Sequence, residues 1–193
     1  MIKHYYYILK LFRPRQWIKN FALFTALVLG GQLFEIDSFT QVFLGFISFC
    51  LLTSSTYIVN DILDVKKDKL HPFKKARPIA SDKISVREGI IIFIVILSLS
   101  LFIAKEVGNG FLLIALLYLV LQMLYSFVFK SIEIFDIFFI AAGYILRVLA
   151  GEVITGYHLS VWLLLTTISL SMFLAVGKRR SELTLLKSYT GLR

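Results

Sequence analysis

The chain has 193 residues, of which 58% are hydrophobic, and it carries a formal net charge of +9 at pH 7. Soluble domains contain roughly 45–50% apolar residues, so this composition excludes an ordinary soluble domain and indicates an integral membrane protein with a basic face. Because the basic residues lie between membrane-length apolar segments, we expect the lipid bilayer as a partner and no nucleic acid.

Six apolar segments approach the length of about 20 residues that a helix needs to cross a bilayer. In chain order they are 20–35, 39–60, 89–105, 110–129, 134–151 and 159–177. Backbone groups in lipid must be satisfied within the segment, so spans of this kind form helices. The sequence therefore predicts an all-α, multi-pass transmembrane bundle of about six spans, in one domain over residues 1–193.

The basic residues are distributed unevenly between the two sides of these spans. Five precede the first span, eight lie between Asn60 and Glu88, and five follow the sixth span, whereas the connections on the other side hold only Lys105. Cytoplasmic connections of membrane proteins carry an excess of Lys and Arg. We therefore predict a protein of the inner or cell membrane with both termini and the 60–88 connection in the cytoplasm.

Three aspartates follow the second predicted span. Asp61, Asp64 and Asp68 have the spacing i, i+3 and i+7, which places them within about 60° of one another on a helix. Carboxylates this close repel one another unless a cation lies among them, and Mg²⁺ prefers such oxygen ligands. We predict that the three aspartates bind Mg²⁺, with Asn60 beside them for substrate. The alternative is a solvated acidic helix end.

Basic residues follow the aspartates within about ten positions. Lys74 and Arg77 are candidates for binding the diphosphate of a substrate that a metal bridges to the carboxylates. Lys74 is equally explained by the positive-inside bias. Arg77 precedes Pro78, which favours an extended backbone and a side chain held in one place. His71 either caps a turn or donates to phosphate.

A second group of charged residues surrounds the start of the fifth predicted span. Lys130 and Asp136 are candidate catalytic residues, with Tyr125 as a candidate for substrate binding, and Asp136 is expected to complete a second acidic wall. Arg147 lies within the apolar run. Charges inside a membrane are costly and indicate function by default, so Arg147 either binds substrate or extends its charge to the interface.

The stretch from Gly177 to Glu182 places Lys178 and Arg179 directly after the last predicted span. These two residues either form a lid over substrate phosphates or only stop the span at the membrane surface.

Together these motifs resemble the UbiA superfamily of membrane-embedded prenyltransferases. The family motif N-D-x-x-D-x-x-x-D corresponds here to Asn60, Asp61, Asp64 and Asp68, followed by Arg77-Pro78 and by Tyr125 and Lys130. The opening R-P-R-Q-W-I-K-N, the tail G-K-R-R-S-E and the second motif are more similar to the branch of decaprenyl-phosphate phosphoribosyltransferases. The resemblance implies a nine-helix bundle, of which this chain would be the first part, with its C-terminus truncated.

The resemblance also implies the reaction. In that branch, a 5-phosphoribosyl group moves from phosphoribosyl pyrophosphate to a polyprenyl phosphate with release of pyrophosphate, and Mg²⁺ is the cofactor. The first alternative is prenyl transfer from a prenyl diphosphate to an aromatic acceptor. A transporter subunit is the alternative outside enzymes, but it predicts charges near the middle of the membrane rather than at one end. Assembly into a homo-oligomer is left open.

Overall fold

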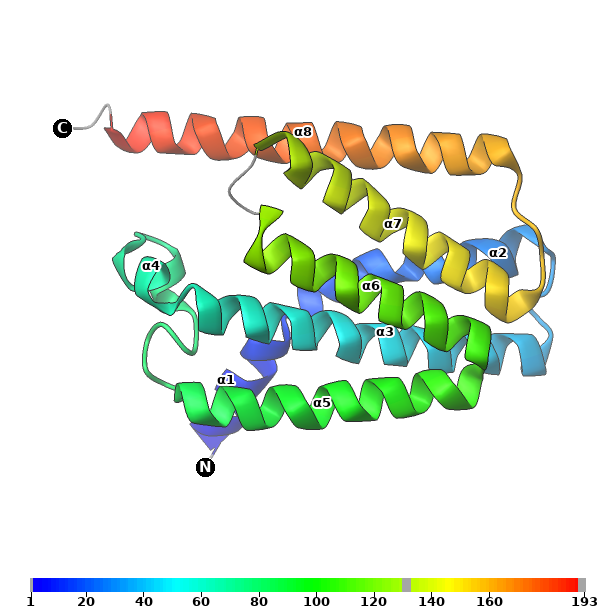
Figure 1. The fold of residues 1–193 in the computed structure, drawn as a ribbon, viewed down its shortest axis with the longest axis horizontal. Helices are drawn as coiled ribbons and strands as arrows, with labels where there is room; N and C mark the ends of the chain where they lie inside the picture. The colour runs from blue at the N-terminus through cyan, green and yellow to red at the C-terminus, as the bar shows by residue number, and fades with distance from the viewer. Residues whose placement is uncertain (1, 130–132, 191–193) are drawn as a thin grey trace.

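The computed structural model describes residues 2–129 and 133–190, and its regular elements are helices (Figure 1). They are α1 (Ile2–Phe12), the 3-10 helix η1 (Pro14–Leu23), α2 (Phe24–Leu29), α3 (Ile36–Leu63), α4 (Val65–Leu70), the 3-10 helix η2 (Lys74–Ala76), α5 (Val86–Val107), α6 (Asn109–Phe127), α7 (Glu133–Thr155) and α8 (Val161–Thr190). The described part of the chain contains no strand, which confirms the all-α prediction.

The boundaries of the helices have local causes in the sequence. The three prolines, Pro14, Pro72 and Pro78, lie outside the long helices, where they break no helical hydrogen bond. At the start of α5, the hydroxyl of Ser85 accepts from the Glu88 backbone N–H, and the Glu88 carboxylate accepts from the Ser85 N–H. This reciprocal capping satisfies two groups that a helix start leaves unpaired.

Within the described residues, four helical segments are long and apolar enough to cross a membrane, where the sequence predicted about six spans. They are Ile36–Leu63, Val86–Val107, Asn109–Phe127 and Ile137–Thr155, while Val161–Gly177 in α8 is a shorter apolar helix. The predicted span 20–35 is not one α-helix, because it consists of the end of η1, the short α2 and a turn. Gly30 caps α2, and Gly31 follows at a φ of 71°, which ends the helix.

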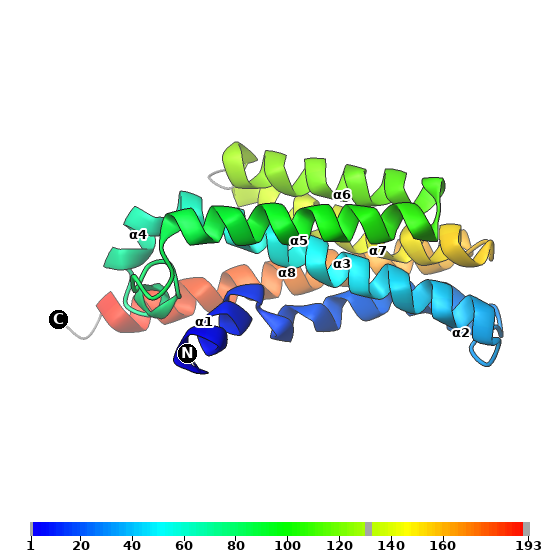
Figure 2. The ribbon, with the colours of Figure 1, turned by 90° about the horizontal axis from the view of Figure 1, so that it is seen from below.

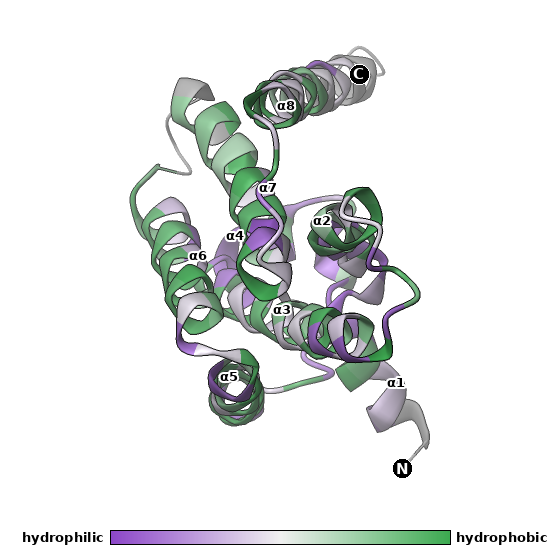
Figure 3. Cartoon of the chain, turned by 90° about the vertical axis from the view of Figure 1, so that its right-hand side faces the viewer, coloured by the Kyte–Doolittle hydropathy of each residue, from purple (hydrophilic) through white to green (hydrophobic). Residues whose placement is uncertain are grey.

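Helix α3 lies at the centre of the bundle and contacts α5, α6 and α7, whereas α8 packs against the far side of α7 (Figure 3). In its most apolar 18-residue window 61% of the residues are buried, against 17% in α5 and 22% in α6. The main core cluster includes Phe49 and Leu52 of α3, Phe111 of α6 and Ala150 of α7. The apolar outer surfaces of α5 and α6 are therefore suited to contact lipid.

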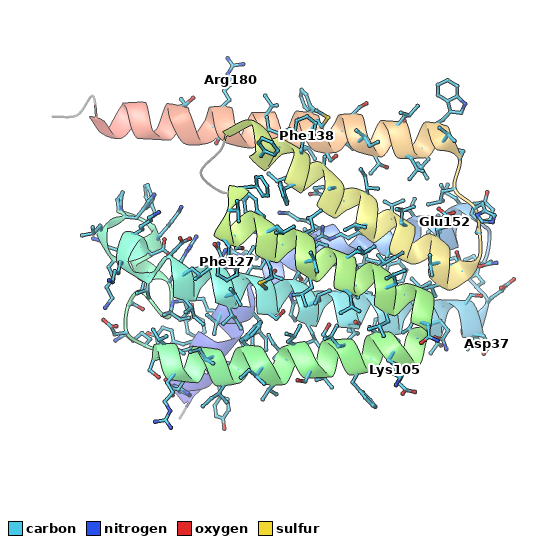
Figure 4. All side chains as sticks on the ribbon, viewed as in Figure 1. Asp37, Lys105, Phe127, Phe138, Glu152 and Arg180 are labelled. Atoms are coloured by element: carbon cyan, nitrogen blue, oxygen red, sulfur yellow. The ribbon has the colours of Figure 1, made fainter. Side chains whose placement is uncertain are left out.

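The helix α1, the helix α4 and the carboxyl end of α8 lie at the same end of the bundle (Figures 1 and 2). Asp37, Lys105 and Glu152 lie at the opposite end (Figure 4). The segments that the sequence assigned to one side of the membrane are thus together in the fold, and the end that carries the acidic motif is called the α4 end below.

Candidate functional site

The acidic motif lies at the α4 end, where α3 passes into α4. Asp61 is in the last turn of α3, Asp68 is in α4, and Asp64 is the residue between the two helices. The backbone at Asp64 has φ −90° and ψ 1°, so the three aspartates do not follow one unbroken helix as their spacing predicted. Both Asp61 and Asp68 are nevertheless buried, with 2% and 3% of their surface exposed.

Arg77 joins the two buried aspartates. Its Nη1 atom lies 2.6 Å from Oδ2 of Asp68 and 3.0 Å from Oδ1 of Asp61. A buried carboxylate is costly unless it is paired, and hydrogen bonds between charged groups are the strong ones. One guanidinium therefore stabilises two carboxylates that lie in different helices.

The loop between α4 and α5 fixes Arg77 in place. Arg77 has an extended backbone, with ψ 146°, as the following Pro78 predicted. Ile79 and Ile84, on the far side of Pro78, are each 1% exposed. Since these apolar side chains anchor the loop in the core, Arg77 points to the aspartates from a fixed backbone.

Arg13 is a further member of the site that the sequence analysis did not identify. It pairs with the same oxygen of Asp61, Oδ1, and its guanidinium lies over the Tyr57 ring, 4.7 Å from the centroid. The backbone of Arg13 is left-handed, with φ 52°, at the junction of α1 and η1. In the sequence, Arg13 is one of five basic residues before the first predicted span. The proline that follows it was the one local indication that its backbone is held in one conformation.

A row of polar contacts continues from this ion pair along α3. The indole of Trp17 donates to Ser54 at 3.0 Å, and the Asn20 amide contacts Cys50 Sγ at 3.3 Å and Thr53 Oγ1 at 3.4 Å. These residues recur every three or four positions on both elements, so one face of η1 lies against one face of α3. The polar row holds η1 to the helix that carries Asp61.

Arg147 lies at the inner end of this row, in the bundle core, and is 5% exposed. It donates to Asn20 Oδ1 at 2.7 Å, to the Tyr118 hydroxyl at 2.8 Å and to the Gly143 carbonyl at 2.7 Å. Its guanidinium also lies over the Tyr118 ring. Arg147 therefore does not extend to the membrane surface, and the structure places it with neutral partners rather than with the aspartates.

The remaining candidates are placed as follows. Lys74 is exposed in η2, near the aspartates in the chain, and the Tyr125 ring is 5.8 Å from the Phe139 ring. His71 caps a turn, because its Nδ1 accepts from the backbone N–H groups of Phe73 and Lys74. Lys130 lies outside the described residues, as do the side chains of Asp136, Lys178 and Arg179, whose backbones belong to α7 and α8.

The model of the UbiA prenyltransferase family matches residues 20–178, which are most of the chain. The chain belongs to this family. The match covers α3, α4 and the loop to α5, and therefore includes Asp61, Asp68 and Arg77. Arg13 precedes it.

Curated UbiA-type relatives resemble this chain along most of its length. It is 35% identical to a decaprenyl-phosphate phosphoribosyltransferase of Corynebacterium glutamicum over 190 residues, which are 96% of the chain and 57% of the relative. It is also 35% identical to the protein of that name from Mycolicibacterium smegmatis, over 92% of the chain and 57% of the relative. The chain thus spans little more than half the length of these two proteins.

Solved UbiA structures share the fold. A UbiA homolog from Archaeoglobus fulgidus bound to GPP and Mg²⁺ superimposes with a TM-score of 0.73 at 26% identity, over 86% of this chain and 60% of that one. The same archaeal homolog bound to DMAPP and Mg²⁺ gives 0.72 at 26% identity. The membrane-bundle prediction is confirmed, and divalent metal is bound by members of this family.

The acidic motif offers a donor set that fits a divalent cation. Within the described residues, no group of three or more His, Cys, Asp or Glu side chains is gathered closely enough to hold a metal. Asp61 and Asp68 nevertheless converge on one positive nitrogen, and each keeps one carboxylate oxygen that accepts no hydrogen bond from a described residue. Mg²⁺ is usually held by one or two carboxylates together with water and substrate phosphates, which matches this pair.

Proposed function

We propose that the chain forms the donor-binding part of a UbiA transferase that moves a 5-phosphoribosyl group from phosphoribosyl pyrophosphate to a polyprenyl phosphate and releases pyrophosphate. The observation that carries the proposal is the convergence of two buried carboxylates, Asp61 and Asp68, on Arg77. It is supported by the 35% identity to proteins named decaprenyl-phosphate phosphoribosyltransferase.

The residues of the site have complementary roles in this reaction. Asp61 and Asp68 would hold Mg²⁺, with Asp64 at the helix junction proposed to join them once substrate is bound, and the bound metal offsets the negative charge that develops on the leaving diphosphate. Arg77 lies beside these carboxylates and can bind phosphate oxygens with its planar fork of donors. The exposed Lys74 supplies a second positive charge near them. The attacking oxygen of the acceptor phosphate is already anionic, so no side chain has to remove a proton from it.

The second group of candidates completes the proposal. Lys130 and Asp136 are proposed to contact the reacting groups, with Asn60, Tyr125, Arg147, Lys178 and Arg179 contributing to substrate binding. We further propose that the α4 end faces the cytoplasm, with both termini on that side, since the basic connections gather there. A water-soluble donor would then reach the aspartates from the cytoplasm, while the lipid tail lies along apolar helix faces.

The experiment is a transfer assay with membranes that contain the protein. The membranes are incubated with Mg²⁺, radiolabelled phosphoribosyl pyrophosphate and polyprenyl phosphate, and labelled lipid and released pyrophosphate are both measured. We expect a labelled lipid in equal amount to pyrophosphate, and its loss when Mg²⁺ is chelated. Labelling from a prenyl diphosphate onto an aromatic acceptor, with none from phosphoribosyl pyrophosphate, would instead assign aromatic prenyl transfer.

A matched pair of variants tests the site in the same assay. Asp61→Asn removes a buried carboxylate that contacts two arginines, and we expect turnover to fall by about 100-fold or more. Asp37→Asn removes an exposed carboxylate in the first turn of α3, at the opposite end of the bundle, and should leave turnover unchanged. Equal turnover in the two variants would show that Asp61 does not serve the reaction.

A further inference from the structure

Asp61 and Asp68 are already balanced in charge by the protein itself. Arg13 and Arg77 both donate to Oδ1 of Asp61, and Arg77 also donates to Oδ2 of Asp68. Two buried carboxylates therefore have two guanidinium groups as counter-ions. A divalent cation that arrived alone would place two more positive charges beside two cations in a partly dry site, where such repulsion is weakly screened.

The diphosphate of a donor removes this conflict. It brings more than one negative charge and several acceptor oxygens, and guanidinium groups match phosphate geometry well. If an arginine leaves a carboxylate for a phosphate oxygen, the carboxylate becomes available to the metal and the arginine keeps an anionic partner. Metal and diphosphate would then each strengthen the binding of the other, by the same factor.

The two arginines differ in how they are held. Arg77 has two carboxylate partners and an anchored loop behind it. Arg13 has one carboxylate partner, Asp61, and its guanidinium lies over the Tyr57 ring, while the two arginine side chains are about equally exposed, at 23% and 22%. Its backbone lies at a left-handed junction between two helical segments, outside the body of either. Arg13 is therefore the counter-ion that can leave Asp61 with the smaller loss of contacts.

We infer that Arg13 is a resident counter-ion of Asp61 that makes metal binding conditional on the donor: it holds Asp61 when no ligand is present and turns to the phosphate oxygens when metal and diphosphate arrive together. This inference rests on the proposed function. It gives the N-terminal segment a positioning role, because η1 and its polar row set the distance between Arg13 and Asp61.

The test measures metal binding rather than turnover. Mn²⁺ serves as the probe, and its free concentration is followed by electron paramagnetic resonance with purified protein in detergent, with and without inorganic pyrophosphate. For the unchanged protein we expect weak Mn²⁺ binding alone and an increase in affinity of about 10-fold or more with pyrophosphate. For Arg13→Gln we expect tighter Mn²⁺ binding alone and a smaller increase with pyrophosphate.

Two further variants make the result specific. Arg13→Lys keeps the charge and should keep the weak Mn²⁺ binding of the unchanged protein, so that an effect seen only in Arg13→Gln is assigned to the lost charge. Arg15→Gln removes an exposed positive charge two residues away and should not change Mn²⁺ binding.

The outcomes separate the inference from the proposed function. If Mn²⁺ and pyrophosphate both bind but Arg13→Gln alters neither the affinity for Mn²⁺ alone nor the effect of pyrophosphate, the role of Arg13 is refuted and the proposed function stands. If the unchanged protein binds neither Mn²⁺ nor pyrophosphate, the proposed function fails and the inference fails with it.

Discussion

Gly151 of α7 lies directly against the backbone of Leu23, the last residue of η1. A Cβ atom built at Gly151 would be 2.0 Å from the Leu23 carbonyl oxygen and 2.9 Å from its carbonyl carbon. Backbone atoms cannot move aside as the tip of a side chain can. The absence of a side chain at this position is therefore what allows α7 to pack against η1 this closely.

We predict that Gly151→Ala destabilises the protein by about 1–3 kcal/mol, because it forces α7 and η1 apart. Thermal unfolding in detergent measures the effect. Gly177→Ala is the matched control, since it is also in a helix and a Cβ there would meet no atom of the described residues within 4 Å. A control that lost as much stability as Gly151→Ala would mean that the loss comes from something other than the contact with Leu23.

A second close contact joins α3 and α5. The hydroxyl of Ser48 donates to the Ser100 carbonyl at 2.9 Å, and the hydroxyl of Ser100 donates to the Ser48 carbonyl at 2.9 Å. Hydrogen bonds between membrane helices contribute about 0.6 kcal/mol on average and up to about 1.7 kcal/mol. We predict that Ser48→Ala and Ser100→Ala each lower stability by an amount in this range.

A double-mutant cycle checks whether the two serines act as a pair. The hydroxyls also lie 3.5 Å from each other, so the two changes should not be additive. Stabilities of both single variants and of the double variant give the coupling. Full additivity would show that each serine bonds only to the opposite backbone and that their hydroxyls do not interact.

The sequence predicted the parts of this structure that depend on local pattern. Long apolar runs without proline gave four membrane-length helices, and the Asn60–Arg77 stretch placed Asp61, Asp68 and Arg77 together because they are close in the chain. Arg77 before Pro78 also proved to have the extended backbone expected of it.

The parts that depend on distant contacts were not predictable in this way. Arg13 reaches Asp61 across 48 positions, and the proline that follows Arg13 indicates a restrained backbone there but not the partner of its side chain. The break at Asp64 and the 3-10 conformation of η1 were likewise not indicated by the spacing of residues in the sequence. For Arg147 the pattern identified a charge in a span but not its partners, Asn20 and Tyr118.

The contact between Arg147 and Tyr118 leads to a third prediction. Tyr118→Phe removes the hydroxyl that accepts from Nη2 of Arg147 and leaves a buried charged donor without that partner. A hydrogen bond to a charged group contributes roughly 1.5–3 kcal/mol to stability. We therefore expect the free energy of unfolding to fall by an amount near the lower end of that range, and Tm to fall by about 3–6 °C.

Tyr144→Phe is the matched control for this change. The Tyr144 ring also lies near the Arg147 guanidinium, at 5.7 Å, but its hydroxyl makes no hydrogen bond within the described residues. The ring stays in Tyr144→Phe, so we expect a change of less than about 0.5 kcal/mol. Similar melting temperatures for the two variants would contradict the role of the Tyr118 hydroxyl.

The last prediction concerns which side of the membrane the α4 end faces. Lys75 is exposed in η2 at this end, and Lys105 is exposed in the last turn of α5 at the opposite end (Figure 4). Because the connection around Lys75 carries eight basic residues, we expect it to be cytoplasmic. In intact cells, Lys75→Cys should resist a membrane-impermeant thiol reagent, whereas Lys105→Cys should react.

The native Cys50 is 2% exposed and should stay unreacted in both variants. After the cells are opened, Lys75→Cys should react as readily as Lys105→Cys, which shows that sidedness and not burial protected it. Rapid reaction of Lys75→Cys in intact cells would reverse the orientation and with it the route by which a cytoplasmic donor reaches Asp61.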